Sequence, residues 1–227
     1  MEEKILILDF GSQYTQLIAR RIRELNIYCE IFPFNKIPEI TPEYVGVILS
    51  GSPFSVHDKD SPEINFETFG NLPVLGICYG AQLIAKENDC VVAKSEIREY
   101  GRAKLSYVNS ENLLMKDVEL DSDVWMSHGD SITEITESFQ VLASTKDVKV
   151  TSYYFKQKNY YGLQFHPEVT HTAFGRKILD NFTVKICGCS QSWNPKRFIE
   201  YTIEQIRDTV KDDKVVLGLS GGVDSSV

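Results

Sequence analysis

The sequence predicts an α/β protein with a mixed, largely parallel β-sheet flanked by helices. Three continuous apolar runs, at residues 5–8, 45–49 and 74–77, read as buried strands. Residues 14–25 follow the first run with apolar side chains at helical spacing. Strands that alternate with helices form parallel sheets covered on both faces, and such sheets bind ligands at the carboxyl ends of their strands.

The centre of the chain has a different pattern. Residues 104–108, 124–126, 141–144, 150–155 and 160–165 read as strands with few helices between them, so we expect antiparallel additions to the sheet. A helix over residues 173–187 closes this unit, because apolar residues form one stripe along it.

A boundary is predicted near residue 190. Asn194 followed by Pro195 is a favourable helix start, and a helix to about residue 210 should lead into a strand at 215–219. We therefore expect one domain over residues 1–190 and an incomplete second α/β domain over residues 191–227.

Composition excludes several classes of protein. The chain has 227 residues and a net charge of -8, which argues against nucleic-acid and membrane partners, because their surfaces attract clustered Lys and Arg. No apolar run reaches the roughly 20 residues that cross a bilayer, and the N-terminus lacks a secretory profile. Five irregularly spaced cysteines indicate free thiols in a reducing compartment. We expect a cytoplasmic protein.

The segment from Gly76 to Gly80 places Cys78 between a strand and a helix. This G-x-C-x-G spacing is the cysteine version of the nucleophile elbow, a tight turn that lifts its central side chain above the sheet. Its position at a helix N-terminus favours the reactive thiolate. A small buried cysteine in an ordinary turn is the alternative, and the spacing by itself leaves both open.

A second motif, His166-Pro167-Glu168, supports the catalytic interpretation. Proline keeps the residue before it extended, so His166 and Glu168 should point to the same side. A carboxylate beside an imidazole fixes its tautomer and stabilises its protonated form, which suits a base that serves a thiol. Taken alone this motif fits a solvated turn, but together with the elbow it favours a Cys78–His166–Glu168 triad.

These residues carry a family resemblance that covers essentially the whole chain. The runs GICYGAQ (76–82), GLQFHPE (162–168) and SGSPFS (50–55) are similar to those of the class I, triad-type glutamine amidotransferases, which have a flavodoxin-like fold. The runs DFGSQY (9–14), VWMSHGD (124–130) and HPEVTHT (166–172) resemble the GMP synthase family within that class.

The resemblance implies a role for each matched residue. Cys78 would be the nucleophile, His166 the acid and base, and Glu168 its orienting partner, in a reaction that converts glutamine to glutamate and ammonia through a glutamyl thioester. The oxyanion hole would use the backbone amides of Ser52 and Tyr79, although Ser52 stands where the family usually has a second glycine. The predicted glutamine-binding residues are Gly51, Gln82, His128 and Asp130. The rival bases are His57, His128 and His171, of which His57 and His171 lack an acid two residues further on.

The last predicted motif is a phosphate loop after the strand at 215–219. It consists of Ser220, Gly221, Gly222, Val223, Asp224, Ser225 and Ser226. Glycine amides and hydroxyls can converge on phosphate oxygens, and the lack of a Walker lysine argues against an ordinary ATPase loop. The run resembles the pyrophosphate-binding loop of N-type ATP pyrophosphatases. The full-length enzyme would then use ATP, Mg²⁺ and XMP to make GMP, and a homodimer is compatible with it. We expect the chain to stop just after this loop, without a synthetase site.

The glutaminase domain itself should need no cofactor and no metal. Cys187 and Cys189 resemble half a metal site, but no second pair completes it, and Cys29 and Cys90 read as core thiols. Two other functions stay open: the amidotransferase of another synthetase, and a catalytically silent docking module. The phosphate loop argues against the first, and an intact triad argues against the second.

Overall fold

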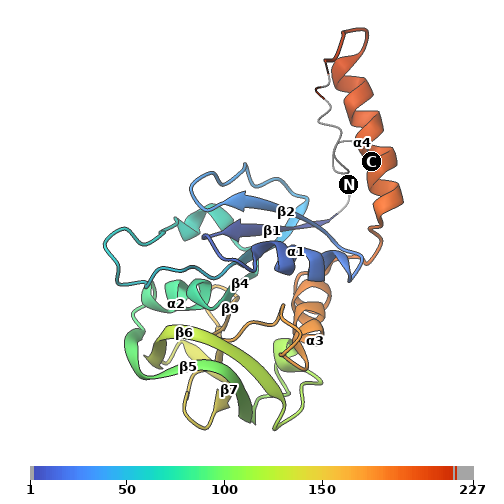
Figure 1. Ribbon diagram of the computed structural model, residues 1–227. Helices are drawn as coiled ribbons and strands as arrows, with labels where there is room; N and C mark the ends of the chain where they lie inside the picture. Colours follow the sequence, from blue (N-terminus) through green and yellow to red (C-terminus); the bar gives the residue numbers. More distant parts are fainter. Residues whose placement is uncertain (1–2, 217, 219–227) are drawn as a thin grey trace. The chain divides into compact units, whose positions relative to one another are not determined.

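The computed structural model describes residues 3–216 and 218, and the chain divides into two compact units, residues 1–192 and 193–227 (Figure 1). All the described strands belong to the first unit, whereas the second contains helix α4 (Pro195–Val210). Among the described residues, no helix combines the length and the apolar character that a membrane span requires.

The first unit is built on one mixed sheet with the strand order β2-β1-β3-β4-β9-β8-β7-β5-β6. Neighbours pair in parallel from β2 to β9 and antiparallel from β9 to β6. The predicted mixed α/β sheet is therefore confirmed. The strands are β1 (Lys4–Asp9), β2 (Tyr28–Pro33), β3 (Tyr44–Leu49), β4 (Val74–Ile77), β5 (Val91–Val108), β6 (Asp123–Glu134), β7 (Phe139–Thr145), β8 (Ser152–Phe155) and β9 (Tyr160–Leu163).

Helices cover both faces of the parallel part of the sheet. On one face, α1 (Thr15–Arg23) and α3 (Gly175–Asp180) bury Ile18, Ile22 and Ile178 against the strands. On the other face, α2 (Tyr79–Lys86) buries Leu83 and Ile84 in a second apolar cluster. Short 3₁₀ turns lie at Phe66–Phe69 and Leu113–Met115. The buried core is therefore split by the sheet into two layers.

Three predicted elements differ from the structure. The strand predicted at 160–165 is not a purely antiparallel addition, because β9 pairs in parallel with β4 and antiparallel with β8. The helix predicted over 173–187 widens into a π-helical turn over Asn181–Ile186. Val215, Val216 and Gly218 form no strand, since among the described residues of the second unit no other strand is present to pair with them. The predicted phosphate loop, Ser220 to Ser226, lies outside the described residues.

Three strands were missed or predicted at less than their full extent. β2 was absent from the prediction, and β5 and β6 form a hairpin-like pair that extends from Lys104 and Asp123 to Val91 and Glu134. The register shifts between Lys94 and Glu99, so that β5 bulges opposite residue 129 of β6. This pair brings polar residues of β6 to the carboxyl edge of the parallel strands.

The packing at Gly162 yields a stability prediction. A Cβ atom at this position in β9 would lie 2.2 Å from the ring of Tyr153, which is fully buried and donates a 2.6 Å hydrogen bond to the Ala81 carbonyl. Gly162→Ala should therefore lower the free energy of unfolding by about 1–3 kcal/mol. Thermal denaturation should show a melting temperature lower by several degrees, at roughly 2–4 °C per kcal/mol.

Gly129→Ala is the matched control, because a Cβ atom there would meet no atom within 4 Å. An equal loss of stability in both variants would contradict the packing argument.

Candidate active site

Cys78 occupies a strained turn between β4 and α2. Its backbone has φ 52° and ψ -107°, a region that residues with a side chain rarely adopt. The flanking glycines permit the turn: a Cβ at Gly76 would lie 2.5 Å from the Gly80 backbone, and one at Gly80 would lie 2.6 Å from Leu49. The turn exposes the thiol to a pocket, although only 6% of Cys78 is accessible.

Strand pairing brings His166 to the same place. β9 lies beside β4 with Leu163 opposite Ile77, and the Cys78 amide donates a 2.7 Å hydrogen bond to the Leu163 carbonyl. The chain then runs three residues further to His166, whose amide donates to the Trp125 carbonyl of β6 at 3.0 Å. His166 is therefore held between the parallel strands and β6.

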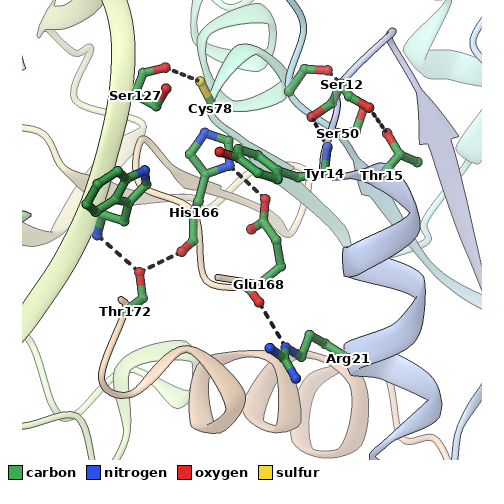
Figure 2. A network of polar contacts seen from close by, with 12 residues as sticks. Ser12, Tyr14, Thr15, Arg21, Ser50, Cys78, Ser127, His166, Glu168 and Thr172 are labelled. Carbon is green, nitrogen blue, oxygen red and sulfur yellow. Dashed lines mark hydrogen bonds and ion pairs between the residues drawn. The ribbon is translucent and has the colours of Figure 1, made fainter. Parts of the chain in front are cut away.

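Cys78, His166 and Glu168 lie in line, with the imidazole in the middle (Figure 2). His166 Nδ1 is 2.7 Å from Glu168 Oε1, and 3% of His166 and none of Glu168 is exposed. Burial opposes the charged imidazolium, but hydrogen bonding with Cys78 and Glu168 outweighs it and raises the pKa of His166 to about 10. The site thus favours a protonated imidazole next to the thiol.

The backbone around this pair is anchored from two sides (Figure 2). The Thr172 hydroxyl donates to the His166 carbonyl at 2.6 Å and accepts from the Trp125 amide at 3.1 Å. From α1, Arg21 Nε donates to the Glu168 carbonyl at 2.9 Å. The sequence did not predict these anchors: Arg21 and Trp125 are distant from their partners in the chain, and the Thr172 hydroxyl, six residues after His166, has no local pattern that marks its contact.

The carboxylate itself has few contacts. Oε2 of Glu168 is buried without a hydrogen-bond partner among the described residues. The Tyr14 ring packs edge-on against His166 with 5.2 Å between ring centroids. The orientation of Glu168 therefore depends on its backbone anchor and on its single contact with His166.

A pocket of about 540 Å³ opens above the thiol. Its lining includes every predicted oxyanion and glutamine-binding residue: Gly51, Ser52, Tyr79, Gln82, His128 and Asp130. Cys78 and His166 also line it, whereas Glu168 lies behind the imidazole and does not. Asp9, Ser12 and Thr15 form a hydrogen-bonded cluster that fixes the loop after β1 beside this pocket.

The loop after β3 approaches the thiol closely. A Cβ atom on Gly51 would lie 3.7 Å from the Cys78 Cβ and 3.5 Å from the His166 ring. The Ser50 hydroxyl secures the loop by donating to the Gly51 carbonyl at 2.9 Å and accepting from the Phe10 amide at 3.0 Å. Ser52 has no positive φ, so its side chain causes no backbone strain where the resembled family has glycine.

Tyr79 is the first residue of α2, so its amide has no acceptor within the helix. Its side chain points away from the pocket, and the hydroxyl donates to the Pro62 carbonyl at 2.5 Å. The loop amide of Ser52 and the free amide of Tyr79 therefore flank Cys78 as potential donors to an anionic oxygen.

The substrate-binding candidates gather on β6 and α2. Gln82 Nε2 donates to the Asp130 carbonyl at 2.7 Å, which joins α2 to β6. His128 is 3% exposed and neither ring nitrogen has a hydrogen-bond partner among the described residues. Burial lowers the pKa of His128 to about 4, so its imidazole is neutral near pH 7.

The other histidines lie apart from the thiol. His57 Nε2 hydrogen-bonds with the Val92 carbonyl at 2.7 Å, and His171 packs against Trp125 with 4.5 Å between ring centroids. Neither residue lines the pocket.

All five cysteines are free thiols, and Cys29 and Cys90 are buried in the two core layers, as predicted. Among the described residues, no group of three or more His, Cys, Asp and Glu side chains is placed to hold a metal ion.

Comparisons with known proteins agree with this geometry. Residues 6–186 match the family described as Glutamine amidotransferase class-I. The chain is 58% identical over its whole length to "GMP synthase [glutamine-hydrolyzing]" of Cytophaga hutchinsonii and 54% identical to "GMP synthase [glutamine-hydrolyzing] 1" of Bacteroides thetaiotaomicron. It spans 45% of the length of each of these curated relatives.

A solved structure has the same fold. This protein from Thermoplasma acidophilum, described as one subunit of a GMP synthase, superposes with a TM-score of 0.67 at 30% sequence identity. The similarity covers 91% of the present chain and 98% of the other. The family match, the shared fold and the relatives agree that the chain belongs to the class I glutamine amidotransferase family.

Proposed function

We propose that this chain hydrolyses glutamine to glutamate and ammonia through a Cys78–His166–Glu168 triad and a glutamyl thioester. In the whole protein, the ammonia would serve the ATP-dependent amination of XMP to GMP. The observation that carries this proposal is the buried 2.7 Å contact of His166 with Glu168, next to a cysteine in a strained turn.

The first half-reaction follows from the order of the three side chains. The Cys78 thiolate attacks the side-chain carboxamide carbon of glutamine, and the electron pair of the C=O bond moves to the oxygen. Amides of Ser52 and Tyr79 stabilise that oxyanion. His166 gives its proton to the nitrogen, and the C–N bond breaks. Ammonia departs, and a glutamyl thioester remains on Cys78.

The second half-reaction uses the same groups in reverse. His166, now neutral, takes a proton from water as the water attacks the thioester carbon. The C–S bond then breaks, which gives the γ-carboxylic acid and the thiolate of Cys78 beside a protonated imidazole, and the acid loses its remaining proton to water to become glutamate. Glu168 keeps Nδ1 protonated in both steps, so that Nε2 faces the reacting atoms.

The link to GMP rests on the relatives, which carry the name GMP synthase. We propose ATP, Mg²⁺ and XMP as ligands of the whole protein, with ATP bound by the loop from Ser220 to Ser226, and no cofactor for the glutaminase reaction. We also propose a homodimer for the whole protein. Five free thiols support a cytoplasmic location.

A silent docking module and the amidotransferase of another synthetase are the alternatives. Measurement of glutamate release from glutamine by the intact protein, with and without ATP and XMP, separates the three. Glutamate release with GMP formation supports the proposal, glutamate release without GMP indicates another synthetase, and no release indicates a docking module.

Replacement of the nucleophile should abolish the reaction. Cys78→Ala removes only the sulfur atom, so we expect glutamate release to fall by at least about a thousandfold while the melting temperature changes little. Cys90→Ala is the control, because burial raises the pKa of the Cys90 thiol and makes it inert. Loss of activity in the control, or normal activity of Cys78→Ala, would contradict the assignment.

The contact of Glu168 with His166 should help to determine the pH above which kcat/KM falls. Its contact with His166 raises the pKa of the imidazole, which reaches about 10, so wild-type kcat/KM should fall as pH rises through that value. Glu168→Gln removes the negative charge, so the alkaline limb should move to lower pH and kcat should fall roughly a hundredfold. A pH profile of kcat/KM with an unmoved alkaline limb would be inconsistent with this role.

The Thr172 hydroxyl should act on the rate through the position of His166. Thr172→Val leaves two buried backbone groups unpaired, so we expect kcat to fall about tenfold with little change in KM. Thr172→Ser keeps the hydroxyl and should restore kcat. Thr183→Val is the control: Thr183 is also buried, but its hydroxyl donates to the Leu179 carbonyl at 2.8 Å, four residues back in its own helix, and not to the backbone of His166. Equal kcat values in Thr172→Val and Thr183→Val would refute a positioning role.

A further inference from the structure

A third side chain, that of Tyr14, contacts the imidazole of His166. The two ring centroids are 5.2 Å apart and the ring planes meet at 68°, an edge-to-face arrangement that aromatic rings prefer. The two nitrogens of the imidazole face Glu168 and Cys78, whereas Tyr14 approaches it as a ring (Figure 2). Tyr14 therefore contacts His166 without occupying either of the nitrogens that carry protons.

The loop that joins β1 to α1 fixes the position of Tyr14. The Tyr14 amide donates a 3.0 Å hydrogen bond to the Ser12 hydroxyl, and the Tyr14 carbonyl accepts one of 2.9 Å from the Ile18 amide at the start of α1. The next residue, Thr15, is 3% exposed, and its hydroxyl donates to the Asp9 carboxylate at 2.7 Å. The backbone of Tyr14 is therefore held at its amide and at its carbonyl, so the ring has a fixed support in the pocket that it lines.

Formation of the thioester changes the contacts that hold His166. In the free protein the imidazole is hydrogen-bonded with both the Cys78 sulfur and the Glu168 carboxylate. In the proposed reaction it gives its proton to the departing ammonia while the sulfur becomes acylated, so the charge-assisted contact with the sulfur is lost. The neutral imidazole then keeps the carboxylate at Nδ1 and the ring of Tyr14. It must still lie within hydrogen-bond reach of the attacking water, so the second half-reaction depends most on Tyr14.

We infer that Tyr14 is a positioning residue that holds the imidazole of His166 in place while the glutamyl thioester is hydrolysed. This inference rests on the proposed glutaminase function. The aromatic ring supplies the effect and the hydroxyl does not, because the contact in the structure is between the two rings. A displacement of about 1 Å in a reacting group costs up to about a hundredfold in rate. Loss of the ring should therefore slow hydrolysis of the thioester more than its formation.

Rapid-quench kinetics of Tyr14→Leu in the intact protein test this role. The rate constant for hydrolysis of the thioester should fall about ten- to a hundredfold. The value of kcat/KM, which reports formation of the thioester, should change little. Ammonia should then appear in a burst before glutamate, and mass spectrometry of the quenched protein should show a glutamyl adduct on Cys78. Tyr14→Phe keeps the ring and should restore the rate of hydrolysis.

Tyr154→Leu is the matched control. Tyr154 of β8 is also a partly buried tyrosine in contact with another ring, but its partner is Tyr161, at 4.7 Å between centroids, and not His166. This variant should leave both rate constants unchanged. Unchanged hydrolysis in Tyr14→Leu, or equal losses in formation and hydrolysis of the thioester, would overturn the inference. A loss in Tyr14→Phe as large as in Tyr14→Leu would also overturn it, since the hydroxyl would then be the group that acts.

NMR of the histidine side chains separates this inference from the function on which it rests. Alkylation of Cys78 with iodoacetamide imitates the acylated sulfur without any turnover. The imidazole of His166 should then give one sharp set of signals in the wild type and in Tyr14→Phe, and broadened or doubled signals in Tyr14→Leu. If the wild type releases no glutamate but these signals depend on Tyr14, the positioning role stands and the glutaminase function fails. If glutamate is released and the signals of Tyr14→Leu stay single and sharp, the function stands and the positioning role fails.

Discussion

The buried contact between His166 and Glu168 is the interaction on which the rest of the site depends. A carboxylate without exposed surface loses its hydration, which costs several kcal/mol, so it needs a cationic partner in direct contact. Glu168 has that partner on one oxygen only, at 2.7 Å, and its other oxygen is unpaired among the described residues. Loss of the imidazole would leave an uncompensated charge at a cost of about 3–5 kcal/mol. The contact between His166 and Glu168 therefore stabilises the fold as well as orienting the imidazole.

The parallel pairing of β4 with β9 makes this contact possible, and it was the part of the fold hardest to predict. β1, β3 and β4 were predicted nearly to their observed ends because strands buried on both faces are continuous apolar runs. The direction of β9 depends on its neighbours, which its own four residues do not reveal. β6 alternates buried and less buried residues as a strand should, but its inward-facing His128 and Asp130 hid that pattern.

Site residues were predictable where chemistry requires a local motif. Cys78 was predicted from two glycines that a strained turn requires, and His166 and Glu168 from the proline between them. Thr172 and Arg21 were not predicted, since a hydroxyl and a guanidinium that bind backbone carbonyls look like any other polar side chains in the sequence. The sequence thus indicates the groups that react more clearly than the groups that hold them in place.

The pocket is lined by residues from two different parts of the sheet, its parallel strands and the antiparallel pair of β5 and β6. The thiol and the imidazole follow adjacent parallel strands, where ladder hydrogen bonds and two apolar layers fix their positions. The charged groups Lys94 and Asp130 instead lie on β5 and β6, next to a register shift that relaxes the ladder. Among the described residues, buried side-chain atoms without a hydrogen-bond partner occur on both sides: the ring nitrogens of His128 on β6, and Oε2 of Glu168 behind the imidazole. Because buried polar groups without a partner destabilise a folded protein, His128 and Glu168 lower the stability of the fold at the site.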